Sequence, residues 1–181
     1  MKLLLHSCCA PCSVQCVQAF DEEGLKPALY WYNPNIHPFT EYRSRRDSLR
    51  LFADQKKLSL FMEDEYGLRD FIKSVEKGAW HQLRCAYCYR LRLEKAASYA
   101  AENAFDAFST TLLISPYQKH ELIKQTGGEL AAAYGIEFLY RDFRPLFREG
   151  QKQARAAGYY MQKYCGCIYS EEERYLGKAA T

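Results

Sequence analysis

The sequence predicts a single Rossmann-like α/β domain built on a parallel five-stranded sheet. A chain of 181 residues, 48% of them hydrophobic, is long enough to bury one core and has the size of an ordinary domain. Short apolar runs alternate with longer stretches of helical periodicity. Because alternating strands and helices form parallel sheets covered on both faces, we expect one domain over residues 1–181.

The expected strands are short apolar runs bounded by turn residues. The first run leads into the turn Ser7-Cys8-Cys9-Ala10-Pro11, and the second into the turn Asn33-Pro34-Asn35. In chain order, strands are expected at residues 2–6, 28–32, 58–62, 106–110 and 136–140.

The stretches between the strands favour helices. Residues 84–103 give the strongest pattern, because alanine, leucine and tyrosine recur at helical spacing without glycine or proline. Gly78 is expected to end a short helix, and the Gly127-Gly128 pair is a weak point in a later one. Helices are expected at residues 12–20, 40–57, 68–77, 84–103 and 117–134.

The turn after the first strand lies where sheets of this type bind ligands, beyond the carboxyl ends of the strands. Cys8 and Cys9 occupy that turn. The sequence contains neither a Gly-x-Gly-x-x-Gly motif nor a Walker-type Gly-Lys-Ser, so dinucleotide and triphosphate binding have no direct support.

Eight cysteines are the most unusual feature of the composition. No stretch approaches the roughly 18 apolar residues of a membrane span, so we expect a cytoplasmic protein whose thiols stay reduced. Closely spaced thiolates converge on metals, and an iron-sulfur centre explains such a pattern economically. The predicted metal ligands form three tight groups: Cys8, Cys9 and Cys12; Cys85 and Cys88; and Cys165 and Cys167.

A structural zinc site and a thiol-disulfide enzyme are alternatives for these cysteines. Zinc needs only four ligands, which leaves three clustered thiols without a role. Cys16, one helical turn beyond Cys12, is better explained as a packed core thiol.

Charge gives a weaker signal, because a net charge of +3 does not identify a nucleic-acid binder. Arginines gather at residues 84–92 and 141–155, beside cysteine motifs, where they produce either a positive field or solvated helix faces. Pairing with Arg141 or Arg144 explains Asp142 more simply than catalysis does.

Five motifs between residues 3 and 170 resemble, in order, those of the QueH family: LLHSCCAPC, RCAYCYRLR, STTLLISPYQ, DFRP and YMQKYCGCIYS. The resemblance implies an epoxyqueuosine reductase, which completes queuosine at the wobble position of tRNA without cobalamin. It also implies a fold like that of the adenine nucleotide α-hydrolase superfamily. The implied cofactors are a [4Fe-4S] cluster and an adjacent mononuclear iron. The implied partners are tRNA carrying epoxyqueuosine and an electron donor of the ferredoxin or flavodoxin type, with no membrane.

The implied centre needs four cluster ligands and about three for the lone iron, which the seven clustered thiols supply. Some relatives carry aspartate at the position of Cys12, which makes Cys12 a candidate ligand of the lone iron and a catalytic residue. How the other thiols divide does not follow from the sequence. Residues 158–181 are expected to complete the metal site.

The implied reaction removes one oxygen from an epoxide with two electrons and two protons. The lone iron is expected to accept that oxygen as a Lewis acid while the cluster delivers electrons. Asp142, a candidate catalytic residue, or a tyrosine at the site is expected to supply a proton. Candidate contacts to the tRNA backbone are Arg84, Arg90, Arg144 and Arg148, and candidates nearer the modified base are Tyr117, Gln118, Tyr159 and Gln162.

Two rival functions belong to other classes. A tRNA sulfur-transfer enzyme of this fold generally needs a Ser-Gly-Gly-x-Asp-Ser loop, where this chain has the turn at residues 7–11. A zinc-stabilised tRNA-binding module would hold zinc without iron.

Overall fold

Five parallel strands form one sheet in the order β3-β2-β1-β4-β5, which confirms the predicted fold class. The structure is a computed structural model that describes residues 1–76 and 80–177, without the side chains of residues 80–82. Gly78, expected to end a helix, therefore lies outside the described residues. The strands are β1 (Leu3–His6), β2 (Ala28–Trp31), β3 (Leu60–Met62), β4 (Ala107–Thr110) and β5 (Glu137–Phe138).

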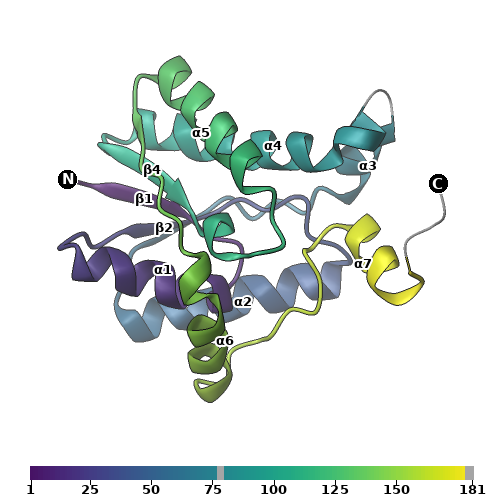
Figure 1. The fold of residues 1–181 in the computed structure, drawn as a ribbon, viewed down its shortest axis with the longest axis horizontal. Coiled ribbons are helices and arrows are strands. Elements are labelled where there is room, and N and C mark those ends of the chain that lie inside the picture. The colour runs from purple at the N-terminus through teal and green to yellow at the C-terminus, as the bar shows by residue number, and fades with distance from the viewer. Residues whose placement is uncertain (77–79, 178–181) are drawn as a thin grey trace.

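Helices cover both faces of this sheet, with α4 and α5 on one side and α1 and α2 on the other (Figure 1). No helix within the described residues combines the length and apolar character that a membrane span requires. The α-helices are α1 (Ala10–Glu22), α2 (Phe39–Lys56), α3 (Leu68–Glu76), α4 (Trp80–Glu102), α5 (His120–Tyr134), α6 (Phe147–Ala156) and α7 (Ile168–Tyr175). Two 3-10 turns, η1 (Thr111–Ile114) and η2 (Arg144–Leu146), precede α5 and α6.

A buried histidine joins the carboxyl ends of the three central strands. The register places His6 of β1 opposite Tyr30 of β2 and Thr110 of β4. His6 Nε2 donates to the Tyr32 carbonyl at 3.3 Å, so Nδ1 accepts from the Thr110 hydroxyl at 2.9 Å. Burial lowers the pKa of His6 to about 4, so the ring stays neutral.

The strand order reverses at β1. The chain moves outward from β1 to β2 and β3, and then continues on the other side of β1 with β4 and β5. The loops after β1 and β4 therefore flank the crevice where ligands of open α/β sheets bind. The backbone N–H of Cys8 donates to the Thr111 hydroxyl at 3.4 Å across this crevice.

Helix α5 departs from the expected pattern in two ways. α5 begins at His120, later than expected, because Ser115 accepts hydrogen bonds from the N–H groups of Tyr117 and Gln118 and closes a turn there. α5 also continues through Gly127, where a Cβ would lie 2.3 Å from the Phe138 ring, so glycine permits close packing there.

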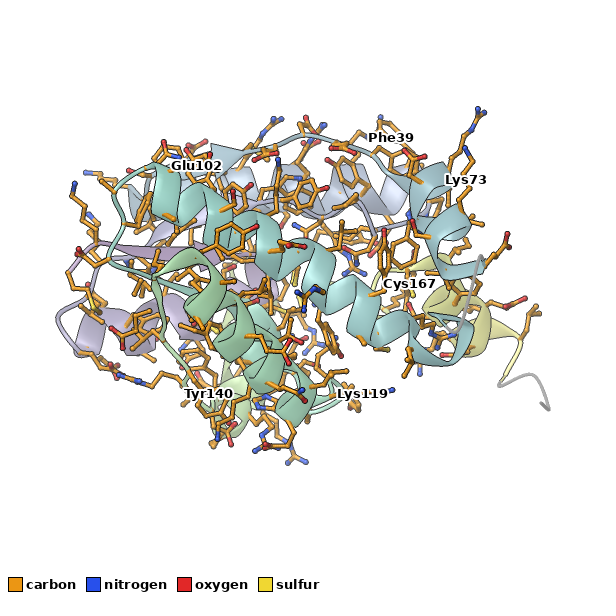
Figure 2. All side chains as sticks on the ribbon, turned by 90° about the horizontal axis from the view of Figure 1, so that it is seen from above. Phe39, Lys73, Glu102, Lys119, Tyr140 and Cys167 are labelled. Carbon is orange, nitrogen blue, oxygen red and sulfur yellow. The ribbon has the colours of Figure 1, made fainter. Side chains whose placement is uncertain are left out.

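The C-terminal part of the chain brings the last two cysteines to the carboxyl end of the sheet. α6 packs on α1, and residues 157–167 then cross α2 to reach α7 (Figure 1). In Figure 2 Cys167 lies beside α4 and the start of α7, and it packs with Cys88 of α4. Cysteines far apart in the sequence thus meet in space.

Candidate metal centre

Three cysteines at the start of α1 form a tight group of potential metal ligands, called here the thiol triad: Cys8, Cys9 and Cys12. Their sulfurs lie within 4.8 Å of one another, and all three residues are buried. Pro11 lies in the first turn of α1 and favours the start of the helix directly behind the loop. Because a metal–sulfur bond is about 2.3 Å long, two sulfurs on one ion lie at most about 4.6 Å apart. The triad therefore has nearly the spacing of ligands to one metal ion.

The three thiols of the triad differ in how readily they ionise. Hydrogen bonds from Cys12 and Cys9 lower the pKa of Cys8 well below its usual range. The contact with Cys8 raises the pKa of Cys12, and burial raises that of Cys9. Metals bind thiolates, so metal binding releases the protons that the thiols still carry.

The other four clustered cysteines come from two distant segments and are called here the assembled group. Cys85 and Cys88 lie on α4, whereas Cys165 and Cys167 precede α7. Cys88 and Cys167 share a small buried cluster with Phe71. Burial raises the pKa of Cys88 to about 12, and its charge interactions include the other three thiols of the group. α4 and the C-terminal segment thus present four thiols to one region.

Arg45 of α2 holds the segment that carries Cys165. Its guanidinium is buried and donates to the carbonyls of Tyr164 at 2.8 Å and Cys165 at 2.9 Å. Nε pairs with Glu41 at 2.7 Å, so the buried charge has a carboxylate partner. Arg45 was not predicted, because in the sequence it stands among other charged residues of a helix and gives no distinguishing signal.

His37 and Gly166 fix the same segment. The His37 N–H donates to the Gly166 carbonyl at 2.8 Å, and Nδ1 accepts from the Ile168 N–H at 3.3 Å. Nε2 donates to the Pro34 carbonyl at 3.0 Å, and burial lowers the pKa of His37 to about 4. Gly166 has φ +141°, and a Cβ there would lie 3.3 Å from the Arg45 guanidinium. The close approach of α2 therefore requires glycine between the two cysteines.

Thiols of both groups open into one cavity of about 720 Å³. Cys8 and Cys12 of the triad and Cys165 of the assembled group line it. Thr111 lines it too, which places the cavity at the crevice between the ends of β1 and β4. The other lining residues are Arg45, Leu112, Ser115, Tyr117, Gln118, Phe147, Gln151, Gln162, Lys163, Tyr164, Ser170, Glu173 and Arg174.

A glutamine amide donates to a sulfur of each group. Gln162 Nε2 lies 3.3 Å from Cys12 Sγ, and Gln118 Nε2 lies 3.2 Å from Cys165 Sγ. Donors of this kind stabilise a thiolate and tune a bound metal. The amides therefore connect the cavity wall to both groups of thiols.

Tyr89 fixes the orientation of the Gln118 amide. The Tyr89 hydroxyl accepts from the N–H of Lys119 at 3.1 Å and donates its own proton to Gln118 Oε1 at 2.6 Å. The amide nitrogen of Gln118 must then face Cys165.

Three of the five predicted substrate-binding residues line the cavity: Tyr117, Gln118 and Gln162. Tyr159 does not line it. Its side chain is buried and packs edge-on against Phe52, with ring centroids 5.7 Å apart. The structure therefore places Tyr159 in the core, away from the predicted base contact.

Asp142 and Arg144 are also outside the set that lines the cavity. Arg144 donates to the Asp142 carboxylate from Nε at 2.8 Å and from Nη2 at 2.5 Å, and the pair is exposed. These bonds lower the pKa of Asp142 to about 2. Asp142 thus lies in a surface pair with Arg144 and outside the residues that line the cavity, and its role as proton donor stays a prediction.

Most arginines predicted to contact tRNA are paired with acids. Arg84, Arg90 and Arg144 each form an ion pair with an acidic side chain. Arg148 is exposed and forms no ion pair among the described residues, but it does not line the cavity. Two exposed cations that do line the cavity, Lys163 and Arg174, also have no ion-pair partner in the described part of the chain. Lys163 and Arg174 were not predicted.

The donor set fits the metals that the sequence predicted. Sulfur-only sites select iron-sulfur clusters or zinc. Two buried cations contact the cysteine-bearing backbone: Arg45 donates to the Cys165 carbonyl, and Arg92 donates to the Cys88 carbonyl. Their charges favour the thiolate form of Cys8. Such cations offset the negative charge of several thiolates in a buried site.

Comparison with known proteins finds one family. Residues 3–173 match the family model described as epoxyqueuosine reductase QueH. A protein from Dehalococcoides mccartyi with that name is 38% identical over 174 residues, which cover 96% of this chain and 94% of the relative. One from Thermotoga maritima is 32% identical over 181 residues, with 95% and 91% covered. Among solved structures, a predicted subunit of tRNA methyltransferase from Methanocaldococcus jannaschii aligns over 97% of this chain and 93% of that chain. The sequence identity is 13% and the TM-score is 0.46.

Proposed function

Because this chain belongs to the epoxyqueuosine reductase QueH family, an oxidoreductase family, we propose that it reduces epoxyqueuosine to queuosine in tRNA. The family match and the curated relatives support this activity, since they cover nearly the whole chain. The observation that carries the proposal is the cavity, because it brings sulfurs of both thiol groups to one substrate-sized space.

The spacing and number of the thiols support a division between two metals. We propose that the thiol triad holds the mononuclear iron and that the assembled group holds the [4Fe-4S] cluster. The triad has three close sulfurs, and the assembled group has the four that a cubane requires. When bound, these cofactors supply electrons and a Lewis acid for the epoxide oxygen. Residues 158–181, of which 178–181 lie outside the described residues, complete this site in a single domain.

The cavity wall offers contacts to the reacting part of the substrate. Gln162 donates to Cys12 through its nitrogen, while its Oε1 is buried and has no partner among the described residues. A buried acceptor without a partner is costly, so this oxygen is available to a hydroxyl or N–H of the substrate. Gln162 would thereby align the substrate with the triad.

The rim of the cavity suits a nucleic acid. Tyr117 is 85% exposed and lies edge-on to Phe147, with ring centroids 6.0 Å apart. Exposed aromatic rings stack on unpaired bases, and unpaired lysines and arginines bind phosphates. We propose that Tyr117 stacks on an anticodon base while Lys163 and Arg174 bind the backbone beside it.

The reaction needs a reductant and a tRNA substrate. We propose an electron donor of the ferredoxin or flavodoxin type, because a cubane passes one electron at a time. We also propose that the protein works in the cytoplasm, where its thiols stay reduced.

The test is direct conversion. Anaerobically reconstituted protein, a chemical reductant and tRNA carrying epoxyqueuosine should yield queuosine, detected by mass spectrometry of the digested tRNA. Unchanged epoxyqueuosine with a fully loaded centre would refute the proposed activity. Zinc without iron after anaerobic purification would instead favour a zinc-stabilised tRNA-binding module, and binding of ATP would favour a sulfur-transfer enzyme.

A further inference from the structure

Arg92 of α4 is a buried cation whose charge has no carboxylate partner. Its side chain is 2% exposed, and Nε donates to the Cys88 carbonyl at 3.1 Å. Nη2 is buried and has no hydrogen-bond partner among the described residues, and no carboxylate in the described part of the chain pairs with the guanidinium. A buried charge in this condition is strongly unfavourable. Arg92 therefore needs a source of negative charge that is not a carboxylate.

The contrast with Arg45 shows that this condition is specific to Arg92. Both arginines are buried, but Arg45 pairs with Glu41 and donates to two carbonyls. Arg92 has one carbonyl bond and a cation–π contact, with its Cζ 5.9 Å from the centre of the Tyr89 ring. These contacts leave most of the charge of Arg92 unbalanced.

The charge of Arg92 acts on thiols of both groups. Its guanidinium donates to the backbone of Cys88 in the assembled group. Its positive charge acts to lower the pKa of Cys88, against the effect of burial, and also that of Cys8 in the triad. Neutral thiols would leave the guanidinium without a counter-charge, whereas metal-bound thiolates balance it. The charge of Arg92 therefore fits a site that carries negative charge.

We infer that Arg92 is the counter-ion shared by both metal groups, and that its charge raises the reduction potential of the cluster held by the assembled group. The inference rests on the proposed metal centre. Adding an electron makes the centre more negative, so a fixed positive charge in a buried, weakly screened site stabilises the reduced form. Arg92 is a positioning and charge-balancing residue and does not contact the substrate.

The experiment is a redox titration of the reconstituted protein, without substrate, monitored by electron paramagnetic resonance. Arg92→Met removes the charge but keeps much of the side-chain volume. We expect it to disfavour one-electron reduction at least tenfold, a shift of about 59 mV to lower potential. Arg92→Lys keeps the charge and should shift the potential much less.

Arg90→Met is the matched control. Arg90 lies on the same helix, but it pairs with Glu129 at 3.1 Å, and both side chains are about half exposed. Solvent screens such a charge, so the potential should stay at the wild-type value. A potential unchanged in Arg92→Met, or lowered equally in Arg92→Met and Arg92→Lys, would overturn the inference.

Iron analysis separates this inference from the proposed function. If the wild-type protein binds no iron, the proposed metal centre fails before Arg92 is tested. If Arg92→Met folds by circular dichroism but binds no iron while Arg92→Lys does, the role of the charge is supported. If both variants fold and neither binds iron, the shape of arginine is required and the inference is overturned.

Discussion

The thiol triad and the assembled group reach the same cavity by different routes. The triad comes from residues 8–12, where one loop and the first turn of a helix place three sulfurs within 4.8 Å. The assembled group joins α4 to a segment near the C-terminus, with Arg45, His37 and Gly166 between them. Local structure therefore suffices for the triad, whereas the assembled group depends on tertiary contacts.

The two groups are therefore sensitive to substitutions in different parts of the chain. Changes in α2 or in the loop before it reach the assembled group through the backbone of residues 164–168. Arg45, His37 and Gly166 hold this backbone and are called here the clamp. Within the described residues the triad shares no hydrogen bond with the clamp, and its bond to Gln162 involves none of these three residues. Substitutions that loosen the clamp should therefore empty one site and spare the other.

Removing a thiol from each group should give the largest and clearest contrast. Cys88→Ala should lose about four irons and all sulfide, because a cubane needs its four ligands. Cys12→Ala should lose about one iron, keep its sulfide and most visible absorbance, and lose turnover. Iron and sulfide analysis of anaerobically reconstituted protein measures both.

Cys16→Ala is the control for these two variants. Cys16 is fully buried one helical turn beyond Cys12 and belongs to neither group, so its removal should leave iron and sulfide unchanged. Equal losses in Cys88→Ala and Cys12→Ala would contradict the division of the thiols.

Gly166→Ala should disrupt the assembled group without removing any of its cysteines. A Cβ at this position would lie 3.3 Å from both Arg45 and Ile36, so the segment between Cys165 and Cys167 must move. We expect loss of cluster absorbance with the triad's iron retained. Gly158→Ala is the control: its φ of +74° costs about 1–2 kcal/mol in stability, but nothing lies within 4 Å of its Cβ. Loss of absorbance in both variants would show general destabilisation.

Removing the Gln118 amide should change only the reduction potential of the cluster, and by less than removing the charge of Arg92. Gln118→Leu removes the hydrogen bond to Cys165, worth about 1 kcal/mol, and should lower the cluster potential less than Arg92→Met does. Tyr89→Phe frees the amide to rotate and should fall between Gln118→Leu and the wild type. Gln162 donates to Cys12 of the triad instead. Gln162→Leu should therefore leave the cluster potential unchanged in a redox titration. An equal shift in Gln162→Leu would contradict this assignment.

Low pH should modestly lower the stability of the protein by protonating His37 of the clamp. The pKa of His37 is about 4 in the folded protein, against 6.5 when unfolded. The unfolded state binds more protons between these values, so stability falls as pH drops from 6.5 to 4, by at most about 3 kcal/mol for this group. Urea unfolding of metal-free protein at pH 7 and pH 4.5 measures the change.

His37→Gln separates this contribution from that of His6. The pKa of His6 is lowered to about 4 as well, so the variant should keep about half of the pH dependence. A pH dependence that is unchanged in the variant would show that His37 does not contribute.

Periodicity and motif spacing predicted much of this molecule. All five strands, and the cysteines that meet at the cavity, lie in segments where apolar runs or paired thiols are visible in the sequence. These features are local, and local patterns carry their signal in the sequence. The turn at Ser115 is an exception: hydrogen bonds from the N–H groups of Tyr117 and Gln118 close it, and helical periodicity does not reveal them.

Contacts between distant segments were not visible in the sequence. Arg45 resembles its charged neighbours until α2 is placed against residues 164–165. Tyr159 stands close to the cysteine motif in sequence but points into the core against Phe52. Asp142 had its nearest partner, Arg144, in its own motif, and that pairing was the simpler expectation.

The iron-to-sulfide ratio distinguishes a cluster and a lone iron at one cavity from a cluster alone. Anaerobically purified protein, analysed for iron, acid-labile sulfide and zinc, should contain about five irons and about four sulfides per chain. Cys12→Ala should then bring the ratio to about four to four. Equal iron and sulfide in the wild-type protein, or zinc in place of iron, would contradict the account.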